Sequence, residues 1–220
     1  MRRAHVFILL GLAFLASGVA AAAPAPGLFR LDEGSEAAGG LELRADGRFA
    51  YALALGALDE HAEGRWEWRD GTICLFTEPT PVPPAFARAE PGEATDPAAT
   101  LLVSWPGGEA IAGIDFRMGL DDGSVIEGYT QYDGWSLPDN DARRPLWIEV
   151  SEPIHRIGPV RFELEPADRA RLRLTLIPND LGVVNFEDAC LDETADGVLF
   201  LHRGGGVMRF TRISAPSAVQ

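Results

Sequence analysis

The stretch GGLELRADGRFAYALALGALDEHAEGRWEWRDGTICLFTEP (residues 39–79) decides the fold, because long parts of it carry apolar side chains at every second position. A period of two is typical of half-buried β-strands, whereas an amphipathic helix repeats every 3.6 residues. The turn residues Ala45-Asp46-Gly47 and Asp70-Gly71 divide the stretch into two successive β-hairpins. We therefore predict an all-β protein organised around these hairpins.

The register of the first hairpin follows from the need to keep its apolar side chains on one face. Leu41 and Leu43 must lie opposite Tyr51 and Phe49, since a shift by one residue would move every side chain to the other face. This pairing requires a three-residue loop with Gly47 at positive φ.

The second hairpin carries the strongest cross-strand pairs. A two-residue turn at Asp70-Gly71 pairs Trp68 with Ile73 and Trp66 with Leu75. Aromatic–aliphatic pairs of this kind stabilise a sheet by about 0.2–1 kcal/mol each.

The opposite face of the second hairpin carries Cys74 and Phe76, so we expect a second layer to pack against it. Cys74 and Cys190 are the two cysteines of the chain. In an oxidising compartment an even pair most often forms a disulfide, and the alternative is two buried free thiols. A Cys74–Cys190 bond would tie the N-terminal hairpins to the C-terminal strands.

The first 22 residues have the pattern of a secretory signal peptide helix. Arg2 and Arg3 precede an apolar run over residues 6–16, and Ala20-Ala21-Ala22 provides the small residues of a cleavage site. The apolar run is too short for a membrane-spanning helix, and we expect no membrane span elsewhere. The pattern predicts cleavage after Ala22 and a periplasmic or secreted protein.

The charge of the chain excludes several kinds of partner. Its formal net charge is −14, and without Arg2 and Arg3 the 17 remaining basic residues face 33 acidic ones, a charge of −16. Such an acidic protein is a poor ligand for nucleic acid or for anionic lipid. Every basic residue is arginine, so lysine-dependent chemistry is also excluded. The Arg-only, Ala-rich composition suggests a bacterial source.

Six prolines between residues 78 and 97 mark the main boundary in the chain. We therefore expect a β-hairpin domain over residues 27–78, a Pro-rich linker over 79–97, a β-sandwich domain over 98–212 and a tail over 213–220. Alternatively, the N- and C-terminal strands form one sheet system around a middle module. Either arrangement is an all-β sandwich or partly closed barrel, with at most one helical turn near residues 165–171.

A run of turn residues in the second half supports a sandwich there. It comprises Gly107-Gly108, Ala112-Gly113-Ile114 and Gly128-Tyr129-Thr130, followed by Asp133-Gly134. In these residues the segment 101–150, about a quarter of the mature chain, resembles the opening of transthyretin-like, carboxypeptidase-regulatory-like modules. The resemblance implies a β-sandwich accessory module, usually non-catalytic, and it brings no site residues with it.

Two groups of side chains are candidate sites. Tyr129, Tyr132 and Trp135 lie close together around a turn and could form an aromatic platform for a sugar or a partner's side chains, or they could belong to the core. Asp139 and Asp141 supply the oxygen ligands that calcium prefers, although their spacing is not that of an EF-hand and acidic turns are common in so acidic a chain.

No motif of a catalytic nucleophile, a phosphate-binding loop or a metal cluster is present, so we expect no cofactor. Our main hypothesis is a non-enzymatic exported protein that binds a protein or glycan partner. The first alternative is a carrier of a small hydrophobic ligand inside a closed barrel. The second is a hydrolase that uses acidic residues, which is the hypothesis with the least support.

Overall fold

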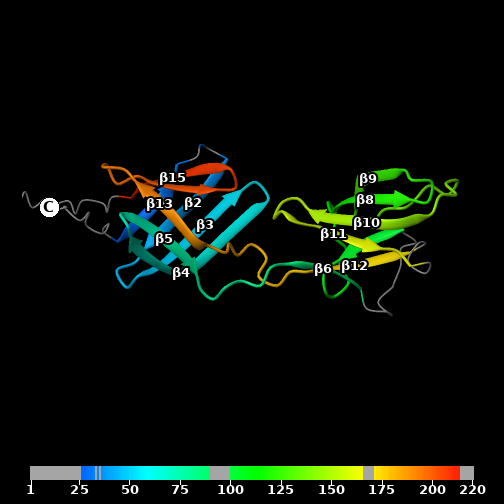
Figure 1. Ribbon diagram of the computed structural model, residues 1–220, viewed down its shortest axis with the longest axis horizontal. Helices are drawn as coiled ribbons and strands as arrows, with labels where there is room; N and C mark the ends of the chain where they lie inside the picture. The colour runs from blue at the N-terminus through cyan, green and yellow to red at the C-terminus, as the bar shows by residue number, and fades with distance from the viewer. Residues whose placement is uncertain (1–25, 33, 35, 90–99, 166–170, 214–220) are drawn as a thin grey trace, which may run out of the picture.

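The computed structural model describes residues 26–32, 34, 36–89, 100–165 and 171–213. These residues form fifteen β-strands and no helix, which confirms the all-β prediction (Figure 1). None of the described segments could therefore cross a bilayer as an apolar helix. The predicted signal peptide, most of the predicted helical turn, part of the Pro-rich segment and all of the tail except Ile213 lie outside the described residues.

Eight strands from both ends of the chain close into a barrel. Around the barrel they follow the order β1 (Gly27–Leu31), β15 (Gly206–Arg212), β14 (Leu199–Arg203), β13 (Glu187–Glu193), β5 (Thr72–Thr77), β4 (Leu58–Arg69), β3 (Arg48–Leu55) and β2 (Ala37–Leu43). The first strand pairs with the last, with Leu31 opposite Phe210. The N- and C-terminal strands thus form one sheet system, which was the alternative arrangement. The predicted sandwich domain over residues 98–212 included β13, β14 and β15, but these three strands belong to the barrel.

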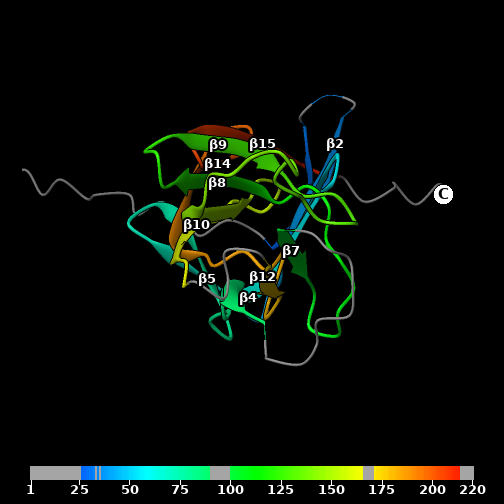
Figure 2. The same cartoon turned by 90° about the vertical axis from the view of Figure 1, so that its right-hand side faces the viewer.

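The other seven strands form two sheets inserted between β5 and β13. One sheet has the order β11 (Ile157–Glu163), β10 (Pro145–Glu152), β8 (Asp115–Leu120) and β9 (Val125–Tyr129). The other has the order β6 (Ala85–Arg88), β12 (Leu172–Ile177) and β7 (Leu101–Ser104). Both sheets contribute to one buried cluster, so they form a two-layer sandwich, which Figure 2 views from its outer end.

All four cross-strand pairs predicted for the two hairpins are present: Leu41–Tyr51, Leu43–Phe49, Trp66–Leu75 and Trp68–Ile73. The turn geometry explains this agreement. Gly47 has a φ of 80°, and Asp70 and Gly71 have φ values of 53° and 87°, so each turn holds the left-handed residues that its loop length requires. Since the turns fix the register, the side chains of these four pairs lie in the barrel core or pack against it.

The outer face of the second hairpin differs from the prediction of a second layer. The Arg65 guanidinium lies 4.0 Å from the centre of the Phe76 ring, and that of Arg69 lies 5.3 Å from it. These cationic side chains shield Phe76 from solvent, because the aliphatic stem and flat guanidinium of arginine cover an aromatic face well. Arginine side chains thus take the place of the expected packing layer over this ring.

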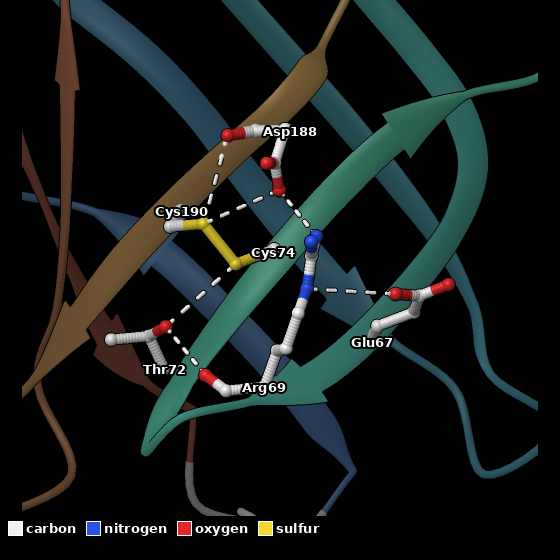
Figure 3. The surroundings of a disulfide bond; sticks show 6 residues. All are labelled: Glu67, Arg69, Thr72, Cys74, Asp188 and Cys190. Atoms are coloured by element: carbon white, nitrogen blue, oxygen red, sulfur yellow. Dashed lines mark hydrogen bonds and ion pairs between the residues drawn. A yellow bond between two sulfur atoms is a disulfide. The ribbon is translucent and has the colours of Figure 1, made fainter.

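The predicted Cys74–Cys190 disulfide is present and joins two neighbouring barrel strands (Figure 3). Cys74 on β5 lies directly opposite Cys190 on β13, with their Cα atoms 3.9 Å apart. Beside the bond, Arg69 forms an ion pair with Asp188. Such a bond is typical of proteins that fold outside a reducing cytosol.

Two connections run side by side between the barrel and the sandwich (Figure 1). The Val82 amide donates to the Asp180 carboxylate over 2.7 Å, and the Asn179 side chain donates to the Pro83 carbonyl over 2.8 Å. At the barrel end, the buried Thr77 hydroxyl donates to the Val184 carbonyl over 2.8 Å. These bonds link the outgoing and returning chains to each other.

Candidate functional site

The three aromatic residues predicted as a platform separate into an exposed pair and a packed one. Tyr129 is 56 % exposed and Tyr132 is 76 % exposed. Trp135 instead packs against the sandwich core, with its ring centre 4.9 Å from that of Phe116, and its amide donates to the Leu101 carbonyl. Trp135 therefore supports the fold, and the two tyrosines are the members of the set that a partner can reach.

The exposed tyrosines lie on and just after β9, the outer strand of the four-stranded sheet. The Thr130 amide donates to the Ile114 carbonyl on the β8 side. Because backbone groups alternate in direction along an antiparallel pair, those of Val125, Glu127 and Tyr129 point away from β8. Within the described residues no strand pairs with this outer side, so β9 presents an open edge.

The other sheet edges of the sandwich have neighbours. At one side β6 and β11 lie together, since the Arg88 guanidinium donates to the Glu163 carbonyl over 2.6 Å. On the other side, Leu101 of β7 forms a bridge with Trp135. An open strand edge with exposed apolar side chains is a template for pairing with another chain, and β9 has both features.

A charged network fixes the turn at the start of β9. Asp141 accepts hydrogen bonds from Arg143, and Arg143 also donates to the Ser124 hydroxyl over 3.0 Å. Arg144 pairs with Asp121 over 2.8 Å. The hydrogen bonds from the Arg143 side chain hold the pKa of Asp141 at about 2.

The same network bears on the predicted calcium ligands. Both carboxylate oxygens of Asp141 accept from Arg143, while Asp139 is exposed. A calcium ion at Asp141 would thus have to displace a guanidinium. In the described part of the chain, the group of three possible ligand atoms that lie close together is Cys74, Asp188 and Cys190, and its two sulfurs are joined to each other.

The substitution Asp141→Asn is expected to lower the melting temperature slightly at pH 7, and this effect is expected to shrink as the pH falls to about 2. The pKa of Asp141 is about 2 in the folded chain against an ordinary value of 3.8. A carboxyl whose pKa is lowered by folding stabilises the fold at pH values above its pKa in the unfolded chain. That stabilisation is lost as the pH falls through its pKa in the folded chain. Melting curves of both proteins between about pH 7 and pH 2 test this. An offset that stays constant at every pH would contradict it.

The barrel interior is filled by its own side chains. Phe29, Phe49 and Phe210 are fully buried, and Phe186 packs edge-on against Tyr51 with ring centres 5.2 Å apart. A small barrel whose inward side chains meet at its axis has no room for a ligand there. The geometry of the interior thus differs from that of a carrier barrel.

No protein-family model matches the chain, and comparison with the curated proteins and with the solved structures found no match. The resemblance of residues 101–150 to transthyretin-like modules therefore rests on the turn residues that suggested it. The function has to be argued from the geometry of the chain itself.

Sequence reasoning found the tyrosines but not the backbone groups of Val125 and Glu127. Whether a strand is an edge depends on the order of strands in the sheet, which local periodicity does not contain. In the structure, exposed and partly buried side chains alternate along β9, so one face of the strand is open to solvent.

Proposed function

We propose that the protein is an exported, non-enzymatic binding protein that pairs an extended segment of a partner protein with β9. The observation that carries the proposal is the open edge of β9 with Tyr129 and Tyr132 exposed on and beside it. In strand addition, backbone hydrogen bonds supply affinity and side-chain contacts supply specificity. Tyrosine suits the second role because it offers a large contact area at a low cost in conformational entropy.

Export is part of the proposal and has two supports. The first is the signal-peptide pattern of residues 1–22, and the second is the Cys74–Cys190 disulfide. The filled barrel favours this function over that of a hydrophobic-ligand carrier. A glycan partner is less favoured than a protein, since Trp135 is withdrawn from the aromatic platform that stacking on a sugar would use.

The double substitution Tyr129→Ser/Tyr132→Ser is expected to weaken partner binding by about tenfold or more, because exposed aromatic anchors commonly contribute over 1 kcal/mol each. The full chain, exported in its native host, would be cross-linked and its captured proteins quantified by mass spectrometry. Leu28→Ser is the matched control, since Leu28 is 50 % exposed on the barrel and far from β9 in the fold.

A partner retained by the wild type and by Leu28→Ser but lost with the tyrosine variant would support the proposal. Glu127→Pro adds a test of strand addition itself, because it removes the outward amide of Glu127 while edge strands tolerate proline. The same captured proteins with all four chains would contradict the proposal.

A further inference from the structure

A second candidate site lies where the sandwich meets the end of the barrel. The tip of the β10–β11 hairpin points towards the barrel (Figure 1). Two neighbouring cavities of about 320 and 200 Å³ lie there, and both are lined by Glu60 and Arg203 of the barrel and by His155 of the hairpin. Side chains of both units therefore form one cleft, which does not involve β9.

A half-buried ion pair forms the barrel side of the cleft. Arg203 donates to Glu60 over 2.8 Å, and the Glu60 side chain is only 13 % exposed. The Tyr51 hydroxyl lies 3.5 Å from Glu60, and burial raises the pKa of Tyr51 to about 12, so the phenol stays neutral. Arg203 thus compensates the charge of Glu60, and this wall contributes no net charge.

The hairpin side of the cleft is held in shape by the buried Glu152. Its carboxylate accepts the Ile154 amide over 3.0 Å and the His155 amide over 2.7 Å, and it lies 3.1 Å from the His155 ring nitrogen Nδ1. Arg156 follows with a φ of 59°, an uncommon conformation for a residue with a side chain. Strained backbone of this kind is often found at binding sites.

Arg156 brings an uncompensated positive charge to the cleft. Its guanidinium lies against Gly204 of the barrel, so close that a Cβ atom built at Gly204 would be 2.8 Å from it. It has no ion pair with any carboxylate of the described residues, whereas many other arginines do. In a chain with a net charge of −14, this guanidinium is an exposed positive charge without a carboxylate partner among the described residues.

Apolar side chains surround this charge. The larger cavity is lined by seven of them: Ala37, Leu53, Leu55, Leu58, Ile154, Val207 and Met208. Leu55, Ile154 and Val207 are each more than 40 % exposed, and they come from both sides of the cleft. A cavity of about 320 Å³ is at the lower end of the range for small-molecule sites, so it suits a group of modest size.

We propose that this cleft binds a carboxylate that carries an apolar group, either a free aliphatic carboxylic acid or the C-terminal residue of a peptide. The Arg156 guanidinium receives the carboxylate in a two-pronged hydrogen bond, and Leu55, Ile154 and Val207 contact the apolar group. A single unpaired guanidinium matches a singly charged carboxylate in geometry and charge. A phosphate carries more charge than this cleft compensates.

The test titrates the full chain with octanoate and with the peptide acetyl-Ala-Ala-Leu, each compared with its uncharged amide, by calorimetry and amide NMR. At least one acid is expected to bind saturably, at least tenfold more tightly than its amide, and to shift the amide signals of His155 and Gly204. Arg156→Gln is expected to weaken that binding by about 10- to 100-fold, as expected for loss of hydrogen bonds to a charged group.

Arg30→Gln is the control, because it removes the same charge from an exposed position on β1. Binding of the peptide without octanoate would identify a chain terminus as the ligand, and the reverse result would identify a free acid. The proposal is overturned if neither acid binds at concentrations up to about 10 mM, or if Arg156→Gln and Arg30→Gln bind equally well.

Discussion

Replacing both Cys74 and Cys190 by serine is expected to lower the free energy of unfolding by about 4–5 kcal/mol. The bond closes a loop of 116 residues, and a long loop gains much conformational freedom in the unfolded chain once the bond is removed. For a chain of this size, the change corresponds to a melting temperature lower by roughly 8–20 °C.

Urea and thermal unfolding followed by tryptophan fluorescence would measure this effect with and without a reductant. The described residues contain no free cysteine, and Cys74 and Cys190 are the two cysteines of the sequence, so the reductant has one target. It should shift the wild type to the midpoint of the double variant and leave that variant unchanged. If the reduced and oxidised wild type unfold at the same midpoint, the disulfide does not constrain the chain as described.

The substitution Phe210→Ala is expected to destabilise the barrel by about 3–5 kcal/mol. Phe210 lies on the last strand, is fully buried, and stands opposite Leu31 of the first strand with its ring centre 6.5 Å from that of Tyr51. Its loss would leave a cavity in the middle of a packed interior, and the surrounding strands are too constrained to fill it.

Denaturant unfolding of the variant provides the measurement, and Val207→Ala on the same strand is the control. Val207 is 49 % exposed, so its truncation should change the free energy of unfolding by no more than about 0.5 kcal/mol. Similar small effects from both substitutions would mean that β15 does not close the barrel core.

The sequence contained the information that determines how strands adjacent in the sequence pair with each other. The period of two and the residues Gly47, Asp70 and Gly71 were enough to predict both hairpin registers, because turn geometry and side-chain facing are local properties. The cysteine pair correctly linked distant segments. The spacing of apolar residues, the turn residues and the cysteine pair thus predicted the fold class, the two hairpins and the disulfide that links distant parts of the chain.

What the sequence left open depends on contacts between distant strands. The strand β13 has the sequence EDACLDE, in which acidic residues hide the period of two, and it is held by β5 and β14 on either side. The strand β6 lies within the segment that proline content marked as a linker, and it forms because β12 provides a partner. Tertiary pairing outweighs local propensity in both places.

The candidate sites were predictable to different degrees, because some of their residues are positioned by contacts with distant parts of the chain. Tyr129 and Tyr132 stand out in the sequence as aromatics beside a turn, whereas the inward position of Trp135 depends on its contact with Phe116. Arg156 gives no sequence signal at all. Its position in a cleft arises because the hairpin that carries it lies against Gly204 of a barrel strand remote in sequence.

Cross-strand NMR contacts between β1 and β15 test most directly the central claim that the two ends of the chain close one barrel around an inserted sandwich. The structure predicts nuclear Overhauser effects between Arg30 and Thr211, together with slow hydrogen exchange of the Ile213 amide, which donates to the Leu28 carbonyl. Contacts of β15 with β14 alone, with β1 paired elsewhere and the Ile213 amide exchanging freely, would contradict it.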